Sequence, residues 1–206
     1  MTSPSGLGVR PMEQADVPEV VRLHQEAFPR NFMTTFGPSF LRAFYTELIA
    51  HPEGYGCVAI EGDGRPVGFC VGGAGGVREI ARSMLLRRPL GFALPTLLNV
   101  VRAPARLVRI LQLAISYLGP SRLADSDPGE AHLLQIAVAE RWRGSGAADL
   151  LVRDFLGEME RRHATSVRLG VTPNNERAIA FYRRMGFHEV KSGIFERSLV
   201  ARGVGG

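Results

Sequence analysis

Residues 132–151 read HLLQIAVAERWRGSGAADLL. The segment from His132 to Val138 is almost continuously apolar, which is typical of a strand buried on both faces. A helix is expected from about Ala147 to Arg162, and a second strand from Ser166 to Val171. This order of strand, helix and strand predicts a βαβ unit, in which the two strands run parallel.

The turn between this strand and helix contains Gly144 and Gly146. Glycine allows a tight turn and a close approach of the backbone to a ligand. The first N–H groups of a helix have no internal partner, and the helix dipole adds partial positive charge there. The turn therefore suits a phosphate, although glycines that serve packing alone are an equal alternative. A dinucleotide-binding pattern is not matched, because a third glycine is missing and Asp149 follows directly.

The N-terminal half contains two helical patterns and a hairpin. Apolar residues at helical spacing predict one helix from Val17 to about Pro29 and another that begins at Pro38. Strands are expected at Gly56–Glu61 and Pro66–Gly72, joined by an Asp-Gly turn. His24 lies on the apolar stripe of the first helix, so we interpret it as a core histidine with satisfied hydrogen bonds.

The C-terminal part predicts a helix over Asn175–Met185, ended by a glycine, and one or two strands over Phe187–Val200. The chain is therefore expected to be α+β, with a central mixed, mostly antiparallel sheet flanked by helices. We predict a single domain over residues 1–206, with residues 77–128 forming a basic helical insertion between the third and fourth strands.

The positive charge of the chain is concentrated in that insertion. Between Val77 and Leu123 there are eight arginines and one glutamate, a net charge of +7, which leaves −2 for the rest of a chain of net +5. Such a segment could attract an anionic substrate, an acidic carrier protein or a membrane surface. A solvated helical face is the alternative.

Several other classes of protein do not fit the sequence. Cys57 and Cys70 lie in strand-like runs without metal-ligand or disulfide spacing, so we expect no metal. The arginines are not interleaved with stacking aromatics, which argues against a nucleic-acid partner. We see no charged-then-apolar leader, and arginines interrupt the apolar stretches, so a cytoplasmic location is expected.

Two segments together resemble the conserved motifs of one superfamily. The segment Val138–Leu151 resembles motif A of the GNAT acetyltransferases, in which Arg143, Gly146 and Ala148 match an Arg/Gln-x-x-Gly-x-Gly/Ala core. The segment Asn175–Phe187 resembles motif B of that superfamily. The two motifs stand in the right order, so the resemblance implies the GNAT fold and acetyl-coenzyme A (acetyl-CoA) as co-substrate.

The resemblance also implies roles for individual residues. The strand backbone would pair with the pantetheine arm, and the turn amides would bind the pyrophosphate. The helix predicted over Asn175–Met185 would contribute further cofactor contacts. Tyr182 would act as the general acid that protonates the departing thiolate. The implied cofactor-binding residues are Ile136, Ala137 and Val138 on the strand, Arg143, Gly144, Ser145, Gly146, Ala147 and Ala148 in the turn, and Asn175 and Ala178 on the helix.

The expected glutamate base of the superfamily is absent. The corresponding positions hold His132 and Gly170, so His132 is the candidate base, with Glu130 or a water chain as the alternative. The resulting prediction is an N-acetyltransferase acting on a primary amine of a small molecule, such as an amino sugar or another phosphate-bearing metabolite, or of a peptide. The alternative is a CoA-binding regulatory or membrane-surface module without activity. Either a monomer or a homodimer is expected.

Overall fold

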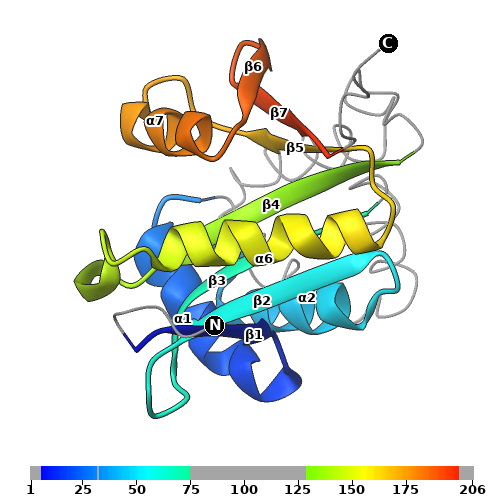
Figure 1. Ribbon diagram of the computed structural model, residues 1–206. Coiled ribbons are helices and arrows are strands. Elements are labelled where there is room, and N and C mark those ends of the chain that lie inside the picture. The colour runs from blue at the N-terminus through cyan, green and yellow to red at the C-terminus, as the bar shows by residue number, and fades with distance from the viewer. Residues whose placement is uncertain (1–5, 32, 75–128, 200–206) are drawn as a thin grey trace, which may run out of the picture.

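The structure is a computed structural model that describes residues 6–31, 33–74 and 129–199 (Figure 1). The predicted helical insertion at 77–128 lies outside the described residues. The helices and strands that position the site are β1 (Gly8–Pro11), α1 (Val17–Ala27), α2 (Pro38–Ala50), β2 (Gly54–Ile60), β3 (Pro66–Ala74), β4 (Glu130–Val138), α6 (Ala147–Arg161), β5 (Ser166–Gly170), α7 (Glu176–Arg184), β6 (His188–Lys191) and β7 (Ile194–Ser198).

The strands of the described residues form one sheet of seven strands in the order β1-β2-β3-β4-β5-β7-β6. Strands β4 and β5 run parallel, and the other neighbouring pairs are antiparallel. The sheet is flanked by helices, so the predicted α+β fold with a mixed, mostly antiparallel sheet is confirmed. The βαβ unit predicted from the 132–151 segment is β4, α6 and β5.

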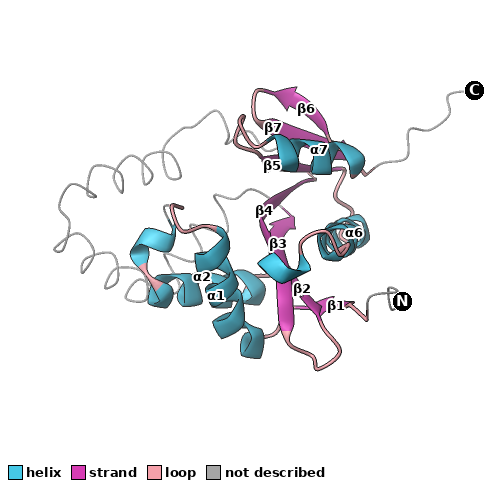
Figure 2. Cartoon of the chain, turned by 90° about the vertical axis from the view of Figure 1, so that its left-hand side faces the viewer, coloured by secondary structure: helices cyan, strands magenta, loops and turns pink. Residues whose placement is uncertain are grey.

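The helices pack on both faces of the sheet (Figure 2). Helices α1 and α2 bury their apolar stripes against β2, β3 and β4 on one face, in a cluster that includes Leu41, Tyr45 and Phe69. Helix α6 packs on the opposite face through Leu151 and Phe155, in a second cluster that also takes in residues of α7. The sheet is therefore covered on two sides, which explains why β4 is apolar along most of its length.

Strand β4 contains a bulge. Gln135 pairs with Val71 and Leu133 pairs with Gly72, so Leu134 has no partner on β3. A Cβ atom on Gly72 would lie 2.1 Å from the His132 carbonyl oxygen, which shows how closely the bulge approaches that strand. A bulge redirects the side chains that follow it. As a result, Leu134 and Gln135 both face α1 and α2, whereas Ile136 packs in the cluster beneath α6.

The contact between β4 and β5 is short. The two strands pair only from Glu130↔Ser166 to Leu133↔Leu169, although β4 continues to Val138. Beyond Leu133 the two strands separate, as Figure 1 shows for the yellow-green and tan strands. The sheet is therefore open along one edge of β4, directly before the glycine turn.

Candidate functional site

The turn between β4 and α6 has the backbone that its glycines predict. Gly144 and Gly146 both have a φ of +88°, in the left-handed region that favours glycine. Gly146 is the N-cap of α6, and no side chain caps that helix end. A Cβ atom at either glycine would meet no atom within 4 Å. These glycines are thus required by their φ angles, and the space around them is open.

The amides of this turn divide into two groups. The Arg143 amide donates to the Glu140 carbonyl at 3.1 Å, and the Ser145 amide donates to Trp142 at 3.3 Å. The amides at positions 144, 146, 148 and 149 donate to no backbone or side-chain acceptor among the described residues. Four unpaired N–H groups at the start of a fifteen-residue helix form a site suited to an anion.

The open edge of β4 supplies further polar groups. The Ala139 amide donates to Val67 at 2.8 Å, so Ala139 faces β3. In an antiparallel strand every second residue directs its N–H and C=O groups to the same neighbouring strand. Ala137 therefore also directs its backbone groups to β3. Ile136 and Val138 direct their N–H and C=O groups to the other side, where β5 has already separated. Of the three strand residues that the sequence implicated, these two have backbone groups available for a ligand.

Helix α7 begins on the far side of this opening. Asn175 is its N-cap, and its side-chain oxygen accepts a bond from the Ala178 amide at 3.1 Å. The carboxamide nitrogen of Asn175, which is exposed, remains a donor for a ligand. Ala178 is half-buried and packs against the cluster beneath α6. Both predicted residues therefore lie at the end of α7 that borders the open edge.

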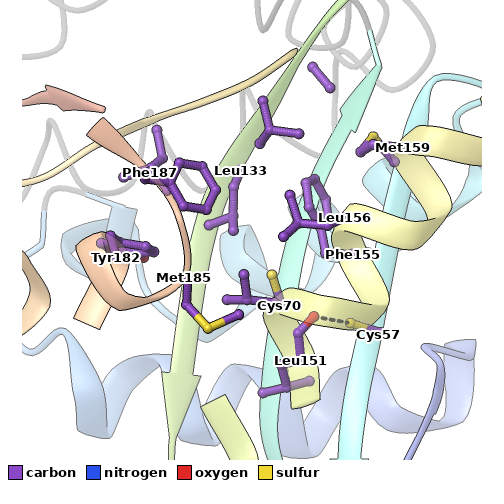
Figure 3. Packing of buried hydrophobic residues seen from close by; sticks show 14 of the residues in the cluster. Cys57, Cys70, Leu133, Leu151, Phe155, Leu156, Met159, Tyr182, Met185 and Phe187 are labelled. Carbon is purple, nitrogen blue, oxygen red and sulfur yellow. Dashed lines mark hydrogen bonds between the residues drawn. The ribbon is translucent and has the colours of Figure 1, made fainter. Parts of the chain in front are cut away.

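Tyr182 lies in the packed part of α7. Figure 3 shows Tyr182 and Phe187 on the side of β4 that carries Leu133, near Met185. Its ring meets Phe187 edge-on at a centroid distance of 5.7 Å, and the residue is 7% exposed. Burial raises the pKa of the Tyr182 phenol above its usual range. The hydroxyl is therefore protonated at neutral pH, which is the form that a general acid requires.

The sequence-predicted base, His132, belongs to a row of charged side chains on the α1/α2 face. Its Nε2 lies 3.3 Å from Glu130 Oε1, and Glu130 Oε2 lies 2.8 Å from Arg168 on β5. Arg168 also pairs with Glu196 on β7 at 2.6 Å. Burial, and after it the Arg168 charge, lowers the pKa of His132. His132 is thus neutral at pH 7 and able to accept a proton.

Two further observations bear on the predicted base. Strand β4 begins at Glu130, two residues earlier than the sequence indicated, which places Glu130 on the same face as His132. Glu130 is 2% exposed, so its carboxylate is held by its partners rather than by solvent. Gly170 ends β5, and a Cβ there would meet no atom within 4 Å. That position contributes space and no functional group.

A buried chain of hydrogen bonds approaches the bulge from α1 and α2. His24 Nδ1 lies 2.6 Å from the Tyr45 hydroxyl, which donates to Gln135 Oε1 at 2.7 Å. The Thr34 hydroxyl lies 3.1 Å from His24 Nε2. The Gln135 Nε2 group approaches the Met33 sulfur at 3.4 Å. The prediction that His24 is a satisfied core histidine is therefore confirmed.

The state of His24 has a measurable consequence for stability. Burial lowers the pKa of His24 to about 4, so the unfolded chain binds the proton more readily than the folded chain. The contribution of neutral His24 is complete above its unfolded pKa of about 6.5 and is lost as the pH falls towards 4. Because the unfolded chain takes up this proton first, we expect the free energy of unfolding to fall by about 2 kcal/mol between pH 7 and pH 5.

Denaturant unfolding at several pH values measures this loss. In the variant His24→Gln the free energy of unfolding should depend less steeply on pH, by about the same amount. His188→Gln, which removes an exposed histidine on β6, provides the control and should keep the wild-type slope. Parallel pH profiles for wild type and His24→Gln would contradict the expectation.

Comparison with known proteins identifies the family. The model described as "Acetyltransferase (GNAT) family" matches residues 17–187, which is most of the chain. The chain belongs to the GNAT family of acetyltransferases. The resemblance found in the two sequence motifs is thereby confirmed.

Individual relatives of the GNAT chain are distant. A stretch of 70 residues is 41% identical to the mycothiol acetyltransferase of Corynebacterium diphtheriae, which is 34% of this chain and 22% of that protein. The chain thus matches less than a quarter of the length of this curated relative.

Among solved structures, NAA60 of Arabidopsis thaliana in complex with acetyl-CoA has a TM-score of 0.60 at 16% identity, covering 94% of this chain and 98% of that one. The ribosomal-protein-S18-alanine N-acetyltransferase of Escherichia coli has a TM-score of 0.59 at 15% identity, covering 96% and 97%. Ard1 from Thermoplasma volcanium reaches 0.58 at 20% identity, covering 95% and 99%. At these identities the likeness establishes the fold alone.

Sequence reasoning missed part of this site. The sequence predicts Gln135 as one residue of an apolar strand and Tyr45 as one residue of a helix, and no pattern connects the two. The signal in the sequence is Gln135 itself, a polar residue inside the apolar run, but it does not predict the bulge.

Within the described residues no group of three or more His, Cys, Asp or Glu side chains could hold a metal ion, and none of the helices could span a membrane.

Proposed function

We propose that this GNAT protein transfers an acetyl group from acetyl-CoA to a primary amine of a small molecule or peptide, with the open edge of β4 as the place of reaction. The observation that carries this proposal is a continuous row of backbone groups that have no partner among the residues that the structure describes. They run from Ile136 and Val138 to the free amides of the turn at Gly144 and Gly146. A long, narrow co-substrate with amides at one end and a pyrophosphate at the other fits this arrangement.

The residues at this edge have complementary tasks. The Ile136 and Val138 backbone would bind the pantetheine amides, and the turn amides at 144, 146 and 148 would bind the pyrophosphate. Arg143 and Ser145 use their amides inside the turn and so shape it. Ala147 and Ala148 keep the helix start free of bulky side chains, while Asn175 offers its carboxamide from the opposite side.

The chemistry requires a neutral amine, a polarised carbonyl and a protonated leaving group. An edge amide of β4 would donate to the thioester oxygen as negative charge develops on it. The buried Tyr182 hydroxyl would protonate the thiolate as the carbon–sulfur bond breaks. His132 would accept the proton from the amine, and its contact with Glu130 would help to stabilise the charge that it gains.

We propose that the basic insertion helps to select the acceptor. Its net charge of +7 between Val77 and Leu123 suits an acceptor that carries phosphate, or an acidic carrier protein. Replacing Arg102, Arg106 and Arg109 with Ser should raise KM for such an acceptor and flatten its dependence on salt. The control variant replaces the exposed arginines Arg22, Arg65 and Arg161 with Ser, which removes the same charge from positions outside the insertion. Equal acceptor kinetics in the two triple variants would contradict a role of the insertion in selecting the acceptor.

The test of the main proposal is a thiol-release assay with acetyl-CoA against a panel of amines, amino sugars and peptides. We expect release of CoA with at least one acceptor and binding of CoA by calorimetry. If no acceptor yields thiol and calorimetry detects no CoA binding, the proposed reaction is wrong. CoA binding without thiol release from any acceptor would instead support the regulatory module.

A further inference from the structure

The bulged part of β4 has unusually little backbone support. Leu134 has no partner on β3, and the pairing with β5 ends at Leu133. Gln135 is therefore the first residue beyond the bulge, with a neighbouring strand on one side only. Ladder hydrogen bonds from two sides normally fix the position of a central strand. At Gln135 a side chain takes over part of that task.

The side chain of Gln135 is held by a rigid partner. Its Oε1 accepts a hydrogen bond of 2.7 Å from Tyr45. Tyr45 is fully buried on α2, and its ring meets Phe44 and Phe69 edge-on at 5.3 and 5.5 Å. A large side chain packed in this way has little freedom to move. The position of Gln135 is thus tied to the core of the α1/α2 face.

Two hydrogen bonds of this chain have a defined direction. Tyr45 has one hydroxyl proton and gives it to Gln135, so neutral His24 must donate from Nδ1 to the Tyr45 oxygen. Nε2 of His24 lies 3.1 Å from the Thr34 hydroxyl oxygen, and Thr34 donates its own proton to the Phe28 carbonyl oxygen at 2.7 Å. Each member of the chain orients the next, from the segment between α1 and α2 to the bulge.

The peptide group after Gln135 is the one that matters for catalysis. The Ile136 N–H belongs to the planar peptide unit that begins at the Gln135 Cα atom, so a constraint on the position of Gln135 restricts the direction of this N–H. The same N–H points to the open edge of β4. We propose that Gln135 is a positioning residue, held by Tyr45, that aims the Ile136 amide at the thioester carbonyl. This inference rests on the proposed function.

The same chain connects β4 with the segment between α1 and α2. Met33 and Thr34 belong to the short 3-10 helix η2 (Met33–Phe36) between α1 and α2, and both contact the chain, Met33 through Gln135 and Thr34 through His24. A displacement of η2 would act on Gln135 from two directions. The position of this segment and the direction of the Ile136 amide are therefore linked.

The alternative is that the chain only stabilises the core. The variant Tyr45→Phe separates the two, because it removes the hydroxyl and keeps the ring. Tyr55→Phe is the matched control: the Tyr55 hydroxyl also donates a bond of 2.7 Å, to Asp154 between β2 and α6, away from the open edge. Both variants remove a phenol hydroxyl and the hydrogen bond that it donates, and Tyr45→Phe also removes the contact with His24 Nδ1. Both should melt at a lower temperature than wild type.

The decisive readout is the infrared C=O stretch of ¹³C-labelled acetyl-CoA bound to each protein. In wild type and Tyr55→Phe, hydrogen bonding by the edge amide should lower this frequency relative to free acetyl-CoA. In Tyr45→Phe the shift should be smaller, kcat should fall about tenfold and the affinity for CoA should stay the same. Gln135→Met, which keeps the length of the side chain, should behave as Tyr45→Phe does.

The outcomes separate the two proposals. If wild type binds acetyl-CoA and is active, but Tyr45→Phe shows the wild-type frequency and kcat, then Gln135 is structural and the inference is overturned. If Tyr55→Phe reduces the shift and kcat as strongly as Tyr45→Phe, the effect is one of general stability, and the inference is again overturned. If wild type neither binds CoA nor releases thiol, the proposed function itself fails.

Discussion

The variant Tyr182→Phe is expected to lower kcat about 100-fold while the affinity for CoA stays close to that of wild type. The hydroxyl would donate the proton that the departing thiolate takes up, and Phe cannot supply one. The ring contacts with Phe181 and Phe187 do not involve the hydroxyl, so the packing of α7 should survive the change. Steady-state kinetics with the best acceptor of the panel, together with CoA calorimetry, provide the measurement.

Tyr55→Phe is again a useful control for this prediction, because it deletes a phenol oxygen from a partly buried ring outside the site. We expect it to retain full activity. A kcat for Tyr182→Phe within about twofold of that control would mean that another donor, such as a water molecule, protonates the thiolate. Tyr182 would then be a core residue of α7 and nothing more.

The second large effect is expected at Gly146. The variant Gly146→Asp should weaken CoA binding on the order of 100-fold, or nearly 3 kcal/mol. The carboxylate would stand among amides that are proposed to bind a pyrophosphate, where a second anion is repelled. Asp tolerates a φ of +88° better than most residues, so the fold should be retained.

Two companion variants separate charge from backbone strain. Gly146→Asn imposes the same shape without the charge and should lose much less affinity than Gly146→Asp. Gly64→Asp places the same residue at a φ of +83° in the β2–β3 hairpin, where a Cβ likewise meets no atom within 4 Å. It should lose similar stability and bind CoA normally. Equal CoA affinity for Gly64→Asp and Gly146→Asp would argue against a pyrophosphate site at this turn.

Much of the fold could be predicted because local signals agree along the chain. The apolar run before Gly144, the glycine-containing turn and the amphipathic segment after it indicated β4 and α6, and both are found. The strands joined by the Asp-Gly turn and the helices at 17–27 and 38–50 followed from periodicity in the same way. These features depend on neighbours in sequence, which is why the sequence contains them.

The features that were missed depend on contacts between distant segments. The bulge at Leu134 arises because β3 and β4 pair out of step, and no local pattern marks it. The partners of Gln135 come from α2 and from the segment after α1, about a hundred residues away in the chain. Likewise the sequence indicates the start of β4 only at His132 and offers Glu130 as an alternative base, because the pairing of Glu130 with Arg168 joins two different strands.

The four-residue ladder between β4 and β5 has a consequence for how the protein opens. On one side of it stand β1 to β4 with α1, α2 and α6, and on the other stand β5, β7, β6 and α7. Cooperative unfolding units tend to divide a protein where few hydrogen bonds connect its parts. The C-terminal part is therefore expected to unfold first. A bound co-substrate that contacts both parts would hold them together where β4 and β5 form no backbone hydrogen bonds.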